Sequence, residues 1–247
     1  MKKLLWLALV GLLTVSLALG GCTKEATKIR VATDATWKPF EYVNEQTKEI
    51  EGFDIDLFKA IAEKANIEVE FINVTWDPLL AGMAQGTYDA AISSISITEE
   101  RQKVMLFSDP YFAAGQLIAV RKDNTTITGK ASLSGKTVGV QLGTTGNIEV
   151  NNIAGATAKL YDDIGLAFQD LMNGQIDAVV ADNPLVLSYV GKNFTKLKTA
   201  GEVFSAENYG IAVAKGKEDL LKKINDGLKK VLAEGIIETL SKKWLEK

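Results

Sequence analysis

One local phrase occurs twice in the chain, and this repeat constrains the fold more than any other feature. Residues 83–92 read Met-Ala-Gln-Gly-Thr-Tyr-Asp-Ala-Ala-Ile, and residues 171–180 read Leu-Met-Asn-Gly-Gln-Ile-Asp-Ala-Val-Val. Each phrase ends an amphipathic helical stretch at a glycine, the residue that most easily closes a helix, and then enters an apolar strand. Any helix–glycine–strand unit has this outline, but the repeated Gly-x-x-Asp-Ala in the same context favours two related lobes.

The remaining chain alternates strand-like and helix-like patterns. Short β-branched or alternating runs predict strands at residues 29–33, 68–74, 88–93, 137–142, 158–161 and 178–181. Helical apolar spacing predicts helices at residues 52–66, 77–85, 145–153 and 164–173. This alternation predicts an α/β fold with largely parallel sheets. Near the C-terminus the pattern changes to a strand at 208–214 and two lysine-rich amphipathic helices at 217–232 and 235–245.

The N-terminal residues read as a targeting segment. Two lysines precede an almost continuously apolar run over residues 4–19, and Leu-Gly-Gly-Cys22 follows. This pattern predicts a signal peptide over residues 1–21. The alternative is a transmembrane anchor, for which the run is slightly short of the roughly 20 residues needed. Because Leu-Gly-Gly-Cys is similar to a bacterial lipobox, we expect Cys22 to be a lipid anchor and residues 22–28 a tether. The protein would then work outside the cytoplasmic membrane, in a periplasm or on the outer face of the membrane.

Composition excludes several classes of function. The 247 residues include no histidine and one cysteine. This removes Ser-His and Cys-His nucleophile pairs, the usual zinc and haem sites, and internal disulfides. Loss of Lys2 and Lys3 with the signal peptide would change the formal charge from −3 to −5, which argues against nucleic-acid binding. No phosphate-binding or dinucleotide-binding glycine motif occurs. We expect neither a metal nor a cofactor.

Polar residues gather where two expected strands end. Residues 93–101 read Ser-Ser-Ile-Ser-Ile-Thr-Glu-Glu-Arg, with Thr98 as the expected cap of a helix. Ligands bind at the carboxyl ends of parallel strands, where hydroxyls and free N–H groups favour an anion and Arg101 could clamp a carboxylate. The alternative for Arg101 is a surface ion pair with Glu99 or Glu100. Residues 143–146, Gly-Thr-Thr-Gly, are similarly placed, although such residues also serve turns.

Acidic and aromatic residues complete this set. Asp34 and Asp182 each end an expected strand and could pair with a cation, although an aspartate two residues before Pro184 is also an ordinary helix cap. Trp37 and Trp76 lie in expected loops, where they would either stack on a ligand or cover a core edge. A buried ligand with both charges needs partners of both signs, so the set implies a small zwitterion such as an amino acid.

These residues belong to motifs that resemble, along the whole mature chain, the polar amino-acid-binding proteins of bacterial ABC importers (family-3 solute-binding proteins). The matching motifs are Asp34-x-x-Trp37-x-Pro39-Phe40, Gly52-Phe-Asp-Ile-Asp-Leu57, Trp76-Asp-Pro-Leu79, Ser96-Ile-Thr-Glu-Glu-Arg101, Phe107-Ser-Asp-Pro-Tyr111 and Asp177-Ala-x-x-x-Asp182. The resemblance implies a two-lobed periplasmic-binding-protein-like fold of type II. Each lobe would be a mixed, mostly parallel sheet flanked by helices. Lobe 1 would hold residues 29–117 and 210–247 and lobe 2 residues 118–209, with hinge crossings near 115–120 and 206–210.

The resemblance also implies a role for each site residue. Arg101 would hold the ligand α-carboxylate with help from Ser94, Ser96 and Thr145. Asp182 would hold the α-ammonium, with the backbone carbonyl of Ser94 as a second acceptor. Trp37 and Trp76 would sandwich the side chain, and Asp34 and Gln141 would contact its distal end. The protein would be a monomeric receptor and not an enzyme, delivering its ligand to a membrane permease after hinge closure.

The identity of the ligand is left open between two classes. Asp34 and the tryptophans suit arginine or another basic amino acid, which we favour, whereas Gln141 suits glutamine or another polar one. Three other functions compete with amino-acid transport. The first is a dehydratase-like enzyme, which would need a carboxylate pair because histidine is absent. The second is a sensory receptor paired with a membrane kinase, and the third is a purely structural surface lipoprotein.

Overall fold

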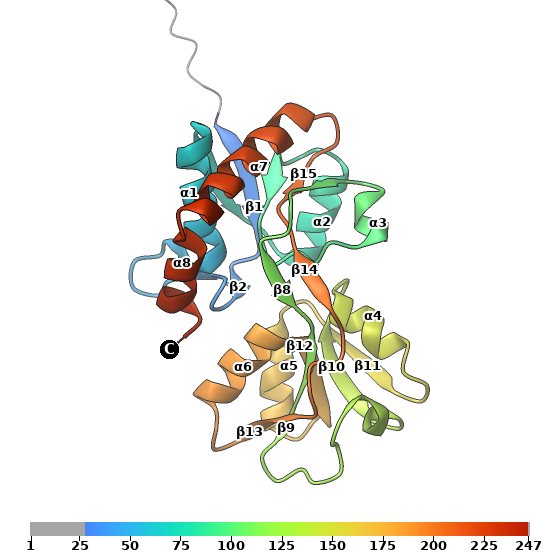
Figure 1. The fold of residues 1–247 in the computed structure, drawn as a ribbon. Coiled ribbons are helices and arrows are strands. Elements are labelled where there is room, and N and C mark those ends of the chain that lie inside the picture. The colour runs from blue at the N-terminus through green and yellow to red at the C-terminus, as the bar shows by residue number, and fades with distance from the viewer. Residues whose placement is uncertain (1–27, 247) are drawn as a thin grey trace, which may run out of the picture.

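The computed structural model describes residues 28–246, which form two lobes, each built around a five-stranded sheet (Figure 1). The expected signal peptide, the Cys22 anchor and most of the tether lie outside the described residues. Within residues 28–246, no helix is both long and apolar enough to cross a membrane.

The first sheet holds the N-terminal strand and a strand from near the C-terminus. Its order is β5 (Val69–Asn73), β1 (Ile29–Thr33), β6 (Ala90–Ala91), β15 (Ala212–Val213) and β7 (Leu106–Phe107). Strand β1 pairs in parallel with β5 and β6, whereas β15 runs antiparallel to β6 and β7. The first sheet is therefore complete only when β15 joins it.

Helices cover both faces of this sheet because side chains along a strand alternate between its faces. Val31 and Ala90 point into the core shared with the first group of helices, whereas Ala32 and Ala91 point into the core beneath α2. The first group comprises α1 (Phe53–Ala65), α7 (Glu218–Ala233) and α8 (Ile236–Trp244). The opposite face carries α2 (Trp76–Ala84) and, nearby, the short α3 (Glu99–Gln102).

The second sheet has a similar parallel centre. Its order is β11 (Thr157–Tyr161), β10 (Thr137–Gln141), β12 (Ala178–Asp182), β9 (Gln116–Arg121) and β13 (Leu197–Ala200). Strand β10 is parallel to β11 and β12, and β9 runs antiparallel to β12 and β13. The helical elements of this lobe are η1 (Lys130–Leu133), α4 (Thr145–Asn151), α5 (Ile164–Met172) and α6 (Asn183–Lys192).

The repeated phrase forms the same unit in both lobes. Gly86 and Gly174 follow α2 and α5 with φ of 71° and 74°, the left-handed conformation that closes a helix at glycine. The aspartate three residues later bonds to the backbone of the neighbouring parallel strand. Asp89 accepts from the Arg30 N–H at 2.7 Å, and Asp177 accepts from the Thr137 N–H at 2.8 Å. The Gly-x-x-Asp spacing thus ties each helix–strand step to the strand beside it.

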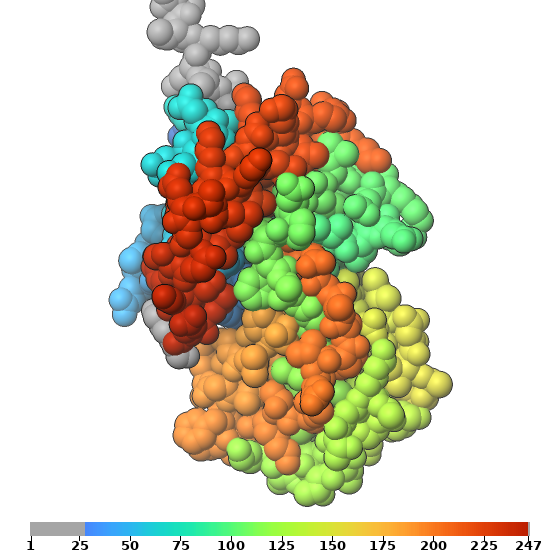
Figure 2. Space-filling model, in the orientation of Figure 1, coloured from blue at the N-terminus to red at the C-terminus, as the bar shows by residue number. Residues whose placement is uncertain are grey.

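Two antiparallel strands, β8 (Phe112–Ala114) and β14 (Glu207–Tyr209), connect the lobes (Figure 1). In the space-filling view, the chain around them crosses the waist between the lobes (Figure 2). The expected single strand at 208–214 is wrong, because the chain leaves β14 at Gly210 and joins the first sheet only at Ala212. Gln116 already pairs in the second sheet, so the first crossing lies at β8, before the expected residues 115–120.

A small antiparallel sheet was not expected from the sequence. It consists of β2 (Thr36–Trp37), β3 (Glu41–Val43) and β4 (Ile50–Glu51), strands too short to show a clear alternation. Trp37 therefore lies on a strand and Trp76 opens α2, so the expectation that both tryptophans lie in loops is wrong.

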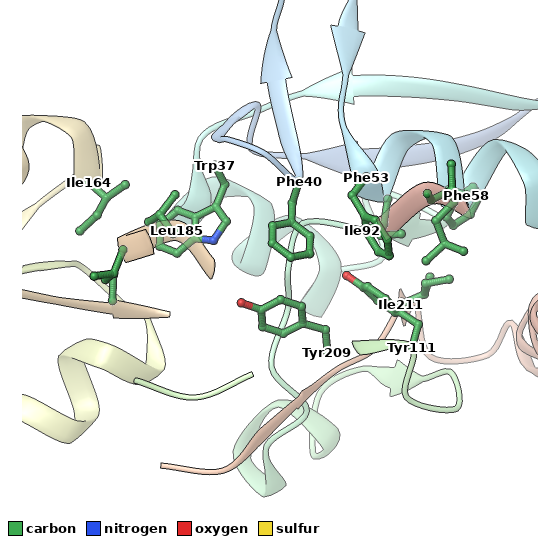
Figure 3. Close-up of a cluster of buried hydrophobic side chains, with 14 of the residues drawn as sticks. Trp37, Phe40, Phe53, Phe58, Ile92, Tyr111, Ile164, Leu185, Tyr209 and Ile211 are labelled. Atoms are coloured by element: carbon green, nitrogen blue, oxygen red, sulfur yellow. The ribbon is translucent and has the colours of Figure 1, made fainter. Parts of the chain in front are cut away.

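An aromatic core lies against the crossing strands (Figure 3). The Tyr209 ring packs on Phe40 and on Phe112, with centroid distances of 5.6 Å in both pairs. Trp37 extends from this cluster toward Leu185 and Ile164 of the other lobe, and all of them belong to one buried cluster. The apolar core is therefore continuous across the cleft in this closed arrangement of the lobes.

Candidate ligand-binding site

A cavity lies between the lobes, and all nine predicted site side chains line it. The predicted residues are Asp34, Trp37, Trp76, Ser94, Ser96, Arg101, Gln141, Thr145 and Asp182. They meet there because they follow, or end, strands whose carboxyl ends face the cleft from both sheets. Glu41, Ser93 and Thr144 also line the cavity, although the sequence did not single them out.

Arg101 is held by backbone carbonyls and not by carboxylates. Its Nη1 donates to the Ser96 carbonyl at 2.8 Å, and its Nη2 donates to the Gly143 carbonyl, from the other lobe, at 3.3 Å. The guanidinium carbon lies 5.2 Å from the Trp76 ring centroid. The alternative of a surface ion pair with a neighbouring glutamate is therefore wrong. Burial acts to lower the pKa of Arg101, but a guanidinium keeps its charge in proteins.

Asp182 faces the cavity from the end of β12. Gln116 Nε2 donates to its Oδ1 at 2.5 Å, and the Tyr209 hydroxyl donates a short hydrogen bond to its Oδ2. The residue stands at the cap position of α6, yet its side chain makes no capping bond. The simple helix-cap alternative is therefore excluded. Burial, followed by the charge of Glu207, raises the pKa of Asp182 to about 6.

Asp34 and Gln141 meet across the cleft. Gln141 Nε2 donates to Asp34 Oδ2 at 3.2 Å and to the Asp162 carbonyl at 3.0 Å, and the Thr36 hydroxyl donates to Asp34 Oδ1 at 3.0 Å. Burial raises the pKa of Asp34 to about 6 despite these hydrogen bonds. This end of the cavity therefore presents an acid that has no positive partner among the described residues.

The two tryptophans are buried walls of the cavity. They are 7% and 8% exposed, and neither indole N–H has a hydrogen-bond partner among the described residues. A buried indole usually finds a partner for its N–H. Both side chains thus present aromatic surfaces to the cavity, with their indole N–H groups unpaired among the described residues.

Sequence reasoning missed Glu41, which lies on β3 and is fully buried. The Ser93 hydroxyl donates to its Oε1 at 3.2 Å. A signal was present, because Glu41 directly follows the quoted Asp34-x-x-Trp37-x-Pro39-Phe40 motif. An acid beside a buried aromatic residue can stay buried only if it is protonated or paired.

Glu207, on the crossing strand β14, was also missed. It accepts from Ser96 Oγ at 2.6 Å, from Thr145 Oγ1 at 2.7 Å, from Ser205 Oγ at 2.8 Å and from Gln116 Nε2 at 3.0 Å. Burial acts to raise the pKa of Glu207, but these hydrogen bonds outweigh it and lower the pKa. An ionised carboxylate therefore bridges hydroxyls of both lobes beside Arg101 and Asp182.

Comparison with known proteins identifies the family. Residues 29–247 match the model of the bacterial extracellular solute-binding proteins, family 3. The chain belongs to this family. The solute-binding protein is 34% identical to the L-cystine-binding protein TcyJ of Escherichia coli, over 96% of this chain and 94% of the relative. It is also 34% identical to the ABC transporter arginine-binding protein 1 of Escherichia coli, over 99% of both chains.

Solved structures agree with this assignment. An ancestral arginine-binding protein bound to arginine shares 44% identity at a TM-score of 0.84, over 88% of this chain and 97% of that one. The expected two-lobed type II fold is thereby confirmed. The protein is an extracytoplasmic amino-acid-binding component of an ABC importer, and its relatives are transport proteins.

Proposed function

We propose that this solute-binding protein captures arginine or another basic amino acid. The observation that carries the proposal is an imbalance of charge in the cavity. Asp34, Glu41 and Asp182 line it, and Arg101 is the only basic residue among the lining residues that the structure describes. An α-carboxylate and an α-ammonium would use Arg101 and Asp182, which leaves two acids for the distal end. Buried acids of this kind are best matched by a ligand cation.

The cavity geometry supports one orientation of the ligand. The α-carboxylate would lie at Arg101, near the hydroxyls of Ser96 and Thr145, and the α-ammonium would lie at Asp182 and the Ser94 carbonyl. The aliphatic stem would run between Trp37 and Trp76, where a flat guanidinium also gains cation–π attraction. The distal cation would then reach Asp34 and Glu41.

Capture proceeds by hinge closure in this proposal. The ligand docks on lobe 1, which holds the first sheet, and lobe 2, which holds the second sheet from Gln116 to Ala200, closes over it by rotation at the strands β8 and β14. The closed form would present both lobes to the membrane permease. We further propose that the receptor acts as a monomer tethered through a lipid on Cys22, after removal of residues 1–21.

Glutamine is the second candidate ligand, favoured by one observation. Gln141 places an amide at the distal end, beside Asp34, where a ligand amide could exchange hydrogen bonds with it. Another structure of an ancestral arginine-binding protein, 44% identical to this chain at a TM-score of 0.84, holds glutamine.

A dehydratase-like activity on this fold is a less favoured alternative. One similar structure, 37% identical at a TM-score of 0.81, is an ancestral amino acid-binding protein that is a precursor of cyclohexadienyl dehydratase. Recovery of the ligand chemically unchanged after release would separate transport from catalysis.

Calorimetric titration with arginine, lysine, histidine, glutamine and cystine tests the proposal. We expect one basic amino acid to bind most tightly at one ligand per chain, and to raise the melting temperature accordingly. Binding of glutamine or cystine at least tenfold more tightly than every basic amino acid would overturn it.

A further inference from the structure

A buried pair of carboxyl groups forms the acidic wall of the cavity. Glu41 on β3 and Asp54 in the first turn of α1 are both fully buried, and the charge of Asp54 acts to raise the pKa of Glu41. Asp54 Oδ2 accepts from the Ser94 N–H at 2.7 Å and from the Tyr111 hydroxyl at 2.8 Å. Asp54 Oδ1 is buried and has no hydrogen-bond donor among the described residues. Glu41 is the member of the pair that lines the cavity.

This arrangement requires one proton between the two groups. Ionised carboxylates only accept hydrogen bonds, so two of them in contact repel each other unless one is protonated. Both acids accept two hydrogen bonds, but the donors to Asp54 lie at 2.7 and 2.8 Å, whereas the Ser93 and Ser94 hydroxyls lie 3.2 and 3.5 Å from Glu41. The shorter bonds favour the ionised form of Asp54, and we therefore assign the proton to Glu41. Burial, then the charges of Asp54 and Asp34, raise the pKa of Glu41 well above its usual value, and burial raises that of Asp54 to about 7.

The surroundings supply no positive charge that could replace this proton. The titratable groups that face the pair are Asp34 after β1, Tyr111 before β8 and Tyr209 on β14, with Asp182 beyond Tyr209. No ion pair in residues 28–246 involves Glu41, Asp54 or Asp34. Among the described residues, Arg101 is the one basic side chain that lines the cavity, and it is bonded to backbone carbonyls, so a further cation at this wall would belong to a ligand.

We propose that a basic amino acid displaces this proton, so that each captured arginine releases one proton from Glu41 to the solvent. This inference rests on the proposed basic ligand. The O–H bond of Glu41 breaks, and the proton passes to water or buffer. The guanidinium of the ligand takes the proton's place beside the carboxylate. The net charge at this wall of the cavity is therefore the same before and after binding. A neutral ligand such as glutamine leaves the proton in place, and the protonated Glu41 can donate to its amide oxygen.

Proton displacement makes selectivity depend on pH. Below the pKa of Glu41 in the empty protein, the affinity for arginine relative to glutamine rises with pH, by about tenfold per pH unit for one proton. Above that pKa the ratio levels off. At lower pH the cavity therefore gains preference for ligands with neutral side chains over basic ones.

Calorimetry in two buffers of different ionisation enthalpy, phosphate and Tris at pH 7, counts the protons. We expect arginine to release about one proton more than glutamine, since contributions of Asp182 and of the α-amino group are common to both ligands. Equal proton counts for both ligands would overturn the inference while leaving arginine binding intact. Absence of arginine binding would instead overturn the proposed function.

Variants of three acids, together with one matched control, assign the proton. Asp34→Asn should retain most of the difference between arginine and glutamine, whereas Glu41→Gln should abolish it. The exposed Glu70→Gln on β5 is the matched control and should change nothing. If Glu41→Gln binds arginine too weakly to measure, Asp54→Asn serves as a second variant. It removes a charge that raises the pKa of Glu41, so arginine binding should release fewer protons. Loss of the difference in Asp34→Asn with retention in Glu41→Gln would assign the proton to Asp34 and refute the role of Glu41.

Discussion

Arg101 and Asp182, which we propose to bind the ligand, are each held in place by neighbours in the empty protein. Arg101 is held by two carbonyls, one from each lobe, and lies close to the negative charges of Asp182 and Glu207 without a direct ion pair. Asp182 is positioned by Gln116 and Tyr209. Each is thus preorganised by neighbours that a ligand does not need to displace, which lowers the cost of binding.

Removing either residue should abolish amino-acid binding without unfolding the protein. Loss of one partner of a buried charge pair with a ligand costs about 3 kcal/mol, roughly a hundredfold in affinity. Calorimetry on Arg101→Ala and Asp182→Ala measures the loss, and circular dichroism checks the fold. Near-normal affinity in both variants would remove them from the site.

Asp34 should distinguish the two ligand classes. Asp34→Asn removes a carboxylate but keeps the hydrogen-bonding shape that receives Thr36 and Gln141. We expect it to weaken arginine binding far more than glutamine binding, because only arginine brings a cation to this end. Equal losses for the two ligands in parallel titrations would exclude Asp34 from contact with the distal group.

The elements were predictable from sequence to different degrees. The apolar spacing located α1, β5 and α5 to within about two residues, because each is long enough to show its period. The sheet β2–β3–β4 and the separation of β14 from β15 were not predictable, because they depend on which distant strand each short segment meets. For the same reason Glu41 and Glu207 were missed, whereas residues at the ends of long strands were selected.

The turn between β10 and α4 lies close to α2 of the other lobe. Gly143 has φ of 72°, and a Cβ at this position would lie 2.9 Å from Asp77 Oδ1 on α2. Gly143→Ala should therefore hinder closure and weaken ligand binding by about tenfold or more, since both the left-handed backbone and the close approach oppose a side chain.

A matched control separates closure from backbone strain. Gly86 has nearly the same φ, 71°, but a Cβ there meets no atom within 4 Å. Gly86→Ala should lower the melting temperature without changing affinity. If both variants bind ligand as the unsubstituted protein does, contact at Gly143 does not limit closure.

At the scale of the whole molecule, the buried acids make the empty protein less stable as pH rises. The pKa values of Asp34 and Asp182 are raised to about 6 and that of Asp54 to about 7, so the folded protein binds protons more tightly than the unfolded chain. Their contribution to stability is present below pH 4 and is lost as pH rises to about 7.

Asp34→Asn isolates one of these contributions. The variant cannot ionise at this position, so its melting temperature relative to the unsubstituted empty protein should increase between pH 4 and pH 7. Saturating arginine should reduce that advantage by supplying the missing cation. A constant difference across this pH range would show that Asp34 titrates normally in the folded protein.

The position of β15 inside the first sheet has a consequence for how the chain is made. Residues of the second sheet, from Gln116 to Ala200, are contiguous, so that lobe can fold as soon as its own segment is available. The first sheet lacks the strand between β6 and β7 until residues 212–213 pair with both of its neighbours. The first lobe therefore depends on a contact between strands far apart in the sequence, a kind of pairing that forms slowly, whereas the second lobe does not wait for it.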